Sequence, residues 1–140
     1  MATGTPNTSA RKMTGQIVGY ARFKVAFGDA ATGVALLKQT LPVGAIVLRA
    51  SIYKTVAFNS ATSAALNVGF AGGTGTELVN AADVKTATGV VAGALSAGAL
   101  APLVADTQLQ ASVAFVGAPT AGAVYVVVEF VTDNDLNFGQ

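Results

Sequence analysis

The sequence contains no histidine, no cysteine and no tryptophan. Without histidine there is no imidazole to act as the general base of a Ser-His-Asp triad. Without cysteine there is no thiol nucleophile, disulfide or iron–sulfur cluster, and the usual tetrahedral zinc sites are excluded as well. Catalysis would depend on seven carboxylates with lysine, tyrosine and serine. We therefore predict that the chain is not an enzyme and binds no metal or other cofactor.

Long hydrophobic runs are also absent, although the mean hydropathy is +0.58. The longest uninterrupted apolar run is Ala123–Val128, whereas a membrane-spanning helix needs about 20 apolar residues. The polar start of the chain lacks the apolar core of a signal peptide. Charged residues make up 11% of the chain, against roughly 25% in ordinary soluble proteins. We expect a soluble protein without a membrane partner, whose surface is largely covered by other protein.

Charge is distributed unevenly along the chain, although the net charge is only +1. Residues 1–60 carry seven basic residues and one acid, and residues 61–140 carry one basic residue and six acids. Either the two halves interleave in one domain, or a basic surface docks on an acidic partner. Nucleic acid is not the expected partner, because the pI is about 8.0 and no basic run exceeds two residues.

Short segments of alternating apolar residues, separated by turn residues, dominate the sequence. Residues 77–86 have the spacing of a helical turn, and residues 93–106 are interpreted as a long connection. The pattern predicts an all-β antiparallel sandwich, a jelly roll of about eight strands, over residues 16–140. Residues 1–15 are expected to form an extended N-terminal arm. Strands are predicted at 16–27, 34–41, 45–58, 64–70, 88–92, 108–117 and 123–132.

Two of these segments make specific predictions about side-chain direction. The last segment, 123–132, is apolar on both faces, so it is either a central strand or lies under a partner. Glu129 lies within it, where a carboxylate is costly unless it is paired. We expect a strand-edge position or an ion pair with a basic residue of the first half. Segment 45–58 is expected to direct one row inward, namely Ile46, Leu48, Ala50, Ile52, Val56 and Phe58.

Tyrosine and basic side chains fall mainly on predicted outward strand faces. Such mixtures bind sugars or nucleic acids, but tyrosine and arginine are equally typical of protein interfaces. The absence of tryptophan favours the protein interface. The candidate interface residues are Arg11, Lys12, Tyr20, Arg22, Arg49, Tyr53, Tyr125 and Val127.

Two motifs resemble ligand-binding loops but lack essential residues. Residues 72–77 are glycine-rich, yet they lack the Gly-Lys-Ser/Thr ending of a P-loop. Residues 133–137 begin like a calcium loop, but Gly139 comes one position late and the sequence ends before a closing glutamate. We interpret the first as a sandwich loop and the second as a polar tail.

Several turns and strand edges resemble those of a known family. The motifs that carry the resemblance are Leu41–Val47, Ala57–Ser63, Leu66–Gly69, Asp83–Gly89, Gly117–Gly122 and Val126–Phe130. The order of these motifs is similar to small jelly-roll capsid cement, or decoration, proteins of tailed double-stranded DNA phages, over roughly residues 16–132. The family has no catalytic residues to carry over.

The resemblance implies a homo-oligomer that binds the outer surface of a phage head and bridges neighbouring major capsid protein subunits. Symmetry favours a homodimer, with a homotrimer as the alternative. The implied location is the capsid surface of a virion assembled in the host cytoplasm. Two other functions are weighed against it. One is a host-glycan-binding module of a head fibre or tail, and the other is a small carboxylate-dependent enzyme such as a glycosidase.

Overall fold

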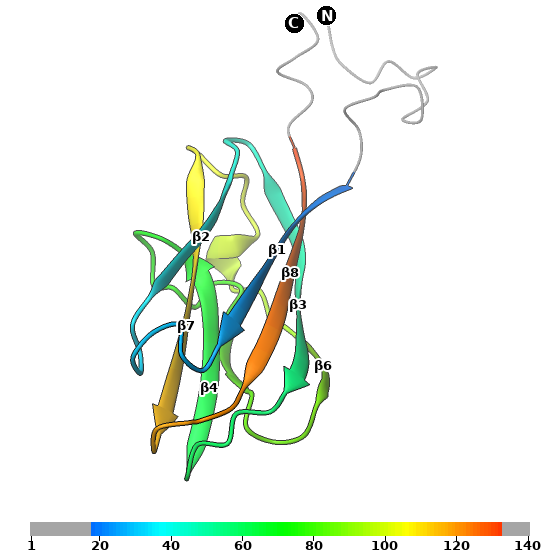
Figure 1. Ribbon diagram of the computed structural model, residues 1–140. Helices are drawn as coiled ribbons and strands as arrows, with labels where there is room; N and C mark the ends of the chain where they lie inside the picture. Colours follow the sequence, from blue (N-terminus) through cyan, green and yellow to red (C-terminus); the bar gives the residue numbers. More distant parts are fainter. Residues whose placement is uncertain (1–17, 133–140) are drawn as a thin grey trace, which may run out of the picture.

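The computed structural model describes residues 18–132, which fold into two facing antiparallel sheets (Figure 1). The first sheet has the strand order β1-β8-β3-β6, and the second has the order β2-β7-β4-β5. Two four-stranded sheets in this order form a jelly roll, as the sequence predicts. The strands are β1 (Val18–Ala26), β2 (Leu36–Leu41), β3 (Ile46–Val56), β4 (Ser63–Phe70), β5 (Val79–Asp83), β6 (Gly89–Ala92), β7 (Thr107–Val116) and β8 (Ala123–Val131).

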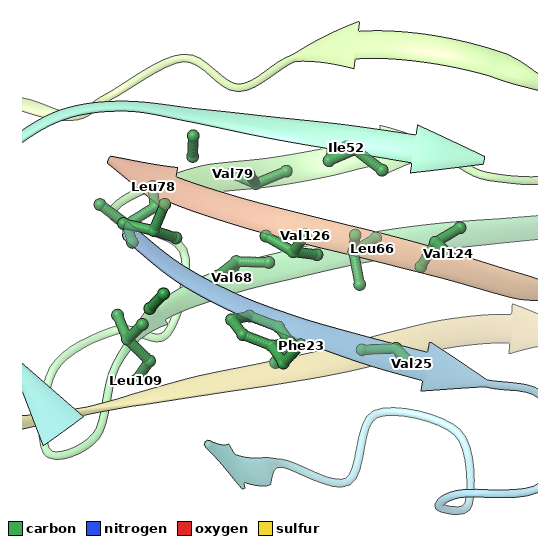
Figure 2. Close-up of a cluster of buried hydrophobic side chains, with 14 of the residues drawn as sticks. Phe23, Val25, Ile52, Leu66, Val68, Leu78, Val79, Leu109, Val124 and Val126 are labelled. Carbon is green, nitrogen blue, oxygen red and sulfur yellow. The ribbon is translucent and has the colours of Figure 1, made fainter. Parts of the chain in front are cut away.

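The core fills the space between the sheets with aliphatic side chains and a few phenylalanines (Figure 2). β1 contributes Phe23 and Val25, and β4 contributes Leu66 and Val68 from the opposite sheet. Every second residue of a strand points to the same face, so simple alternation selects these residues. β8 lies between β1 and β3 and buries Val124, Val126 and Val128 completely. The prediction of a central strand at 123–132 is therefore confirmed.

The predicted inward row of β3 is partly wrong, because two bulges interrupt its pairing with β8. The register shifts between Val47 and Arg49 and again between Lys54 and Val56. Each bulge adds one unpaired residue and reverses the faces that follow it. Val47 is consequently buried, whereas Leu48 and Val56 are exposed. Of the expected row, Ala50, Ile52 and Phe58 are buried.

The helical turn expected at 77–86 is also wrong, because this segment contains strand β5. β5 pairs with β4 through an irregular register. The backbone N–H of Ala81, whose φ is +52°, donates to Asn67 Oδ1 of β4 at 2.7 Å. This side-chain hydrogen bond takes the place of a backbone hydrogen bond between β4 and β5 at Ala81, where φ and ψ depart from extended values. Tertiary pairing thus overrides the local spacing of alanines.

Glu77 closes the glycine-rich loop that follows β4. Its carboxylate accepts hydrogen bonds from the backbone N–H of Phe70 at 3.0 Å and of Thr74 at 2.6 Å. An alanine Cβ at Gly69 or Gly73 would collide with this carboxylate. The Glu77 side chain therefore holds the loop closed. This agrees with the interpretation of residues 72–77 as a sandwich loop.

We expect Glu77→Gln to destabilise the protein by about 1–2 kcal/mol, because an amide offers one oxygen to two backbone donors. Partial burial opposes ionisation of Glu77, but the hydrogen bonds from Phe70 and Thr74 outweigh it and lower the pKa. Ionised Glu77 thus stabilises the fold above about pH 4.3, and this stabilisation is lost as the pH falls through the folded-state pKa. Thermal melting at neutral pH and at about pH 3 should show a smaller acid-induced loss in the variant. Equal losses in both proteins would contradict this role.

Candidate interaction surface

The outward face of the first sheet gathers all six candidate interface residues that the structure describes. The register places them in three neighbouring rows across β1, β8 and β3. Because these residues occupy alternate positions, they share one face. We call this surface the outer face. Its rows are Tyr20–Glu129–Arg49, Arg22–Val127–Ser51 and Lys24–Tyr125–Tyr53, and β6 extends the last row with Val90.

An ion pair fixes one row of the outer face. Arg49 Nε and Nη2 donate to the two carboxylate oxygens of Glu129 at 2.7 and 2.8 Å, in a bidentate arrangement. The hydrogen bond from Arg49 lowers the pKa of Glu129, and the same bond raises the pKa of Arg49. This confirms the prediction that Glu129 pairs with a basic residue of the first half. Both side chains remain accessible, so the pair orders the surface more than it stabilises the fold.

A hollow lies beside this ion pair, over the centre of the outer face. Its lining consists of Arg22, Tyr53, Thr55, Tyr125 and Val127. The guanidinium of Arg22 stacks over the Tyr125 ring, 4.7 Å from its centroid. Stacking holds the arginine in place while its donors stay available to a partner. The hollow thus combines apolar ring surface with directional donors, a combination typical of binding hot spots.

The exposed edge of β1 is covered by side chains from β2. Gln39 Nε2 donates to the carbonyl of Arg22 at 2.6 Å, and Lys38 Nζ donates to the carbonyl of Lys24 at 2.9 Å. Unsatisfied edge carbonyls would otherwise invite another strand to pair. These two side chains therefore occupy carbonyls to which another strand would pair, whereas the broad outer face beside this edge remains exposed.

The opposite broad face, on the second sheet, has a different composition. Its outward positions carry small and amide side chains at paired positions of β4 and β7. Asn67 pairs with Ser112 and Ala65 with Ala114, and on the far side of β7 the exposed Leu37 of β2 pairs with Gln110. Tyrosine and arginine are thus concentrated on the first sheet. The outer face also carries three cations, Arg22, Lys24 and Arg49, against the single acid Glu129 of its rows, which favours an acidic partner surface.

Several sequence predictions lie outside the described residues. These are the arm at 1–15 with Arg11 and Lys12, and the polar segment at 133–137. Within residues 18–132, no group of three or more acids is placed to hold a metal ion. No helix in that part of the chain is long and apolar enough to cross a bilayer.

Sequence reasoning missed several exposed apolar side chains that lie outside the outer face. Leu100 and Val104 are exposed on the connection between β6 and β7, and Val43 is exposed on the turn between β2 and β3. The available signal was the composition of residues 93–105, which include no charged residue. A connection of this length is expected to be polar, so its apolar character marks it as unusual.

Three solved structures are similar to this chain in fold. A chain of the capsid asymmetric unit of cyanophage Pam1 aligns with a TM-score of 0.66 and 29% identity, over 83% of this chain and 85% of that one. A chain of the capsid of Ralstonia phage GP4 aligns at 0.64 and 19% identity, over 84% and 85%. A chain of the acid-stable capsid of Helicobacter pylori bacteriophage KHP30 aligns at 0.62 and 16% identity, over 84% and 90%. No family model and no curated protein matches the sequence.

Proposed function

We propose that this protein is a virion structural protein, a decoration protein that binds the outer surface of a phage head. The observation that carries the proposal is its similarity to a chain of the cyanophage Pam1 capsid, with 29% identity over most of both chains. The two less similar neighbours support the fold. Since the alignment spans similar shares of both chains, the neighbour is also comparable in length. The proposed location is the capsid surface, after assembly in the host cytoplasm.

The outer face is the surface proposed to contact the major capsid protein. It presents an arginine stacked on a tyrosine, two further aromatic or aliphatic residues in one hollow, and an excess of positive charge. Partners with acidic side chains and exposed apolar groups match this surface. A protein that binds the assembled shell more tightly than the free subunits stabilises the shell by mass action. Many copies on one lattice add avidity to each weak contact.

Addition of purified protein to expanded, undecorated capsids of the same virus tests this function. We expect saturable binding and a higher temperature of capsid disruption, because the protein binds the intact lattice preferentially. Binding is measured by co-sedimentation, and stability by the temperature at which packaged DNA becomes accessible to a dye. Absence of both effects would contradict the proposal.

A host-glycan-binding module of a head fibre or tail is the second candidate function. The hollow favours it, because Tyr53 and Tyr125 offer rings for stacking and Arg22 offers donors for an acidic sugar. The same capsid experiment separates the two functions when it is paired with a glycan array. Array binding without capsid binding would replace the decoration role with glycan recognition.

A further inference from the structure

The strand register gives the side chain of Arg22 two possible partners within the outer face. Arg22 of β1 lies directly opposite Val127 of β8. Its diagonal neighbours on β8, two residues to either side of Val127, are Tyr125 and Glu129. Diagonal neighbours in an antiparallel pair are about 7–8 Å apart, within reach of long side chains. Arg22 can therefore stack on the tyrosine ring or pair with the carboxylate.

The arrangement of Arg49 decides between these two partners. β8 lies between β1 and β3 (Figure 1), so Glu129 has Tyr20 on one side and Arg49 on the other. Both carboxylate oxygens of Glu129 accept hydrogen bonds from Arg49, and such a bidentate pair is strongly directional. Arg22 stacks on Tyr125 instead. Among the described residues, the guanidinium of Arg22 is thus left without a carboxylate partner.

The hollow around Arg22 offers few other groups to a polar ligand. The hydroxyl of Thr55 already donates to a backbone carbonyl of β8 at 3.0 Å. Val127 and the rings of Tyr53 and Tyr125 supply mostly hydrocarbon surface. A sugar carries hydroxyl groups around its ring and needs several converging polar groups, whereas an acidic side chain beside an apolar residue needs one fork of donors and an apolar floor. The hollow therefore favours a carboxylate from a protein.

We propose that Arg22 binds an aspartate or glutamate side chain of the major capsid protein, and that Arg49 is a positioning residue that keeps Glu129 from occupying Arg22. The identity of the partner rests on the proposed function. The division of partners between Arg49 and Arg22 is a property of the free protein and is tested without a capsid. Lys24 follows on the same strand face, but it does not line the hollow and its ammonium lacks the planar fork of a guanidinium.

Phenylglyoxal, which modifies accessible guanidinium groups, tests the free protein when the products are read by mass spectrometry. Arg22 is expected to react faster than Arg49, whose donors are engaged by Glu129. In Arg49→Ala the released Glu129 should pair with Arg22 and slow its modification roughly threefold, the size expected of an exposed ion pair. Arg49→Ala/Glu129→Gln should restore the wild-type rate.

Lys24→Ala is the matched control for this experiment, because it removes one positive charge from the same face but releases no carboxylate. It should change the modification rate of Arg22 much less than Arg49→Ala does. Equal rates at Arg22 in the wild type and in Arg49→Ala would overturn the positioning role of Arg49.

Expanded, undecorated capsids of the same virus test the carboxylate contact. Arg22→Lys keeps the charge but loses the planar fork, so it is expected to weaken capsid binding about tenfold, whereas Lys24→Ala should weaken it far less. Arg22 of the bound wild type should be protected from phenylglyoxal. Capsids whose carboxylates have been converted to amides with carbodiimide and glycine amide should no longer bind the protein.

The outcomes separate this contact from the decoration role itself. Wild-type affinity of Arg22→Lys, or an Arg22 that reacts as fast in the complex as in the free protein, would overturn the contact while the decoration role stands. Absence of capsid binding would overturn both, and the modification rates of the free protein would still decide the role of Arg49. Binding of a sialylated glycan that is lost in Arg22→Lys, without protection of Arg22 on capsids, would replace the protein carboxylate with an acidic sugar.

Discussion

Replacing Gly69 with alanine is expected to destabilise the fold by about 3 kcal/mol, a loss of roughly 10 °C in melting temperature. A Cβ at this buried β4 position would meet the Glu77 carboxylate and the backbone of Gly75, and would lie 2.6 Å from the backbone nitrogen of Thr76. A carboxylate can rotate away, but the loop backbone cannot move without breaking the closure by Glu77. Urea or thermal unfolding monitored by circular dichroism measures the loss.

Gly28→Ala is the matched control, because an added Cβ there meets nothing within 4 Å. Gly28→Ala should change the free energy of unfolding by no more than about 0.5 kcal/mol, because its main effect is that alanine restricts the unfolded chain. The double variant Gly69→Ala/Glu77→Gln should not recover stability, since the backbone collision remains. A Gly69→Ala protein as stable as Gly28→Ala would show that the loop rearranges freely and is not a closure.

Strands that pair one residue to one residue were the predictable part of the fold. In β1, β4 and β8, alternation alone selects the buried residues, among them Phe23, Leu66 and Val126. The period of two carries this information because β1 pairs with β8, and β4 with β7, without a register shift. The number of such segments and the turns between them were sufficient to predict a jelly roll.

β3 and β5 were less predictable, because their faces depend on partners distant in sequence. The bulge that buries Val47 and exposes Leu48 exists in the pairing of β3 with β8, and no local pattern specifies it. In β5, pairing with β4 holds a segment of helical spacing as a strand, and Asn67 of β4 supplies the acceptor for Ala81 N–H. Both errors arise from tertiary contacts that override local propensity.

The candidate interaction surface was predictable for a related reason. Tyr20, Arg22, Tyr53 and Tyr125 come from three strands that are far apart in sequence, yet each lies at an outward position of a regular alternation. Once these strands share one sheet, their outward side chains must share one face. The hollow and the stacking of Arg22 on Tyr125 were not predictable, because they depend on diagonal contacts between neighbouring strands.

The double variant Arg22→Ala/Tyr53→Ala is expected to weaken binding to undecorated capsids by about 100-fold. Both side chains line the hollow, and both are exposed, so their removal should leave folding intact. The loss combines the stacked cation with ring surface at the centre of the outer face. A titration of labelled protein against capsids measures the affinity, and circular dichroism verifies the fold.

Lys85→Ala is the matched control for charge, because it removes one cation from the turn between β5 and β6, outside the rows of the outer face. If long-range attraction alone drove binding, Lys85→Ala and Arg22→Ala would weaken it to a similar extent. High salt would then abolish the difference in affinity between each variant and the wild type. If the hollow is a specific contact, only the hollow variants lose affinity, and their sedimentation mass stays that of the wild type. A double variant that binds capsids like the wild type would exclude the outer face as the contact, even if the wild type decorates the shell.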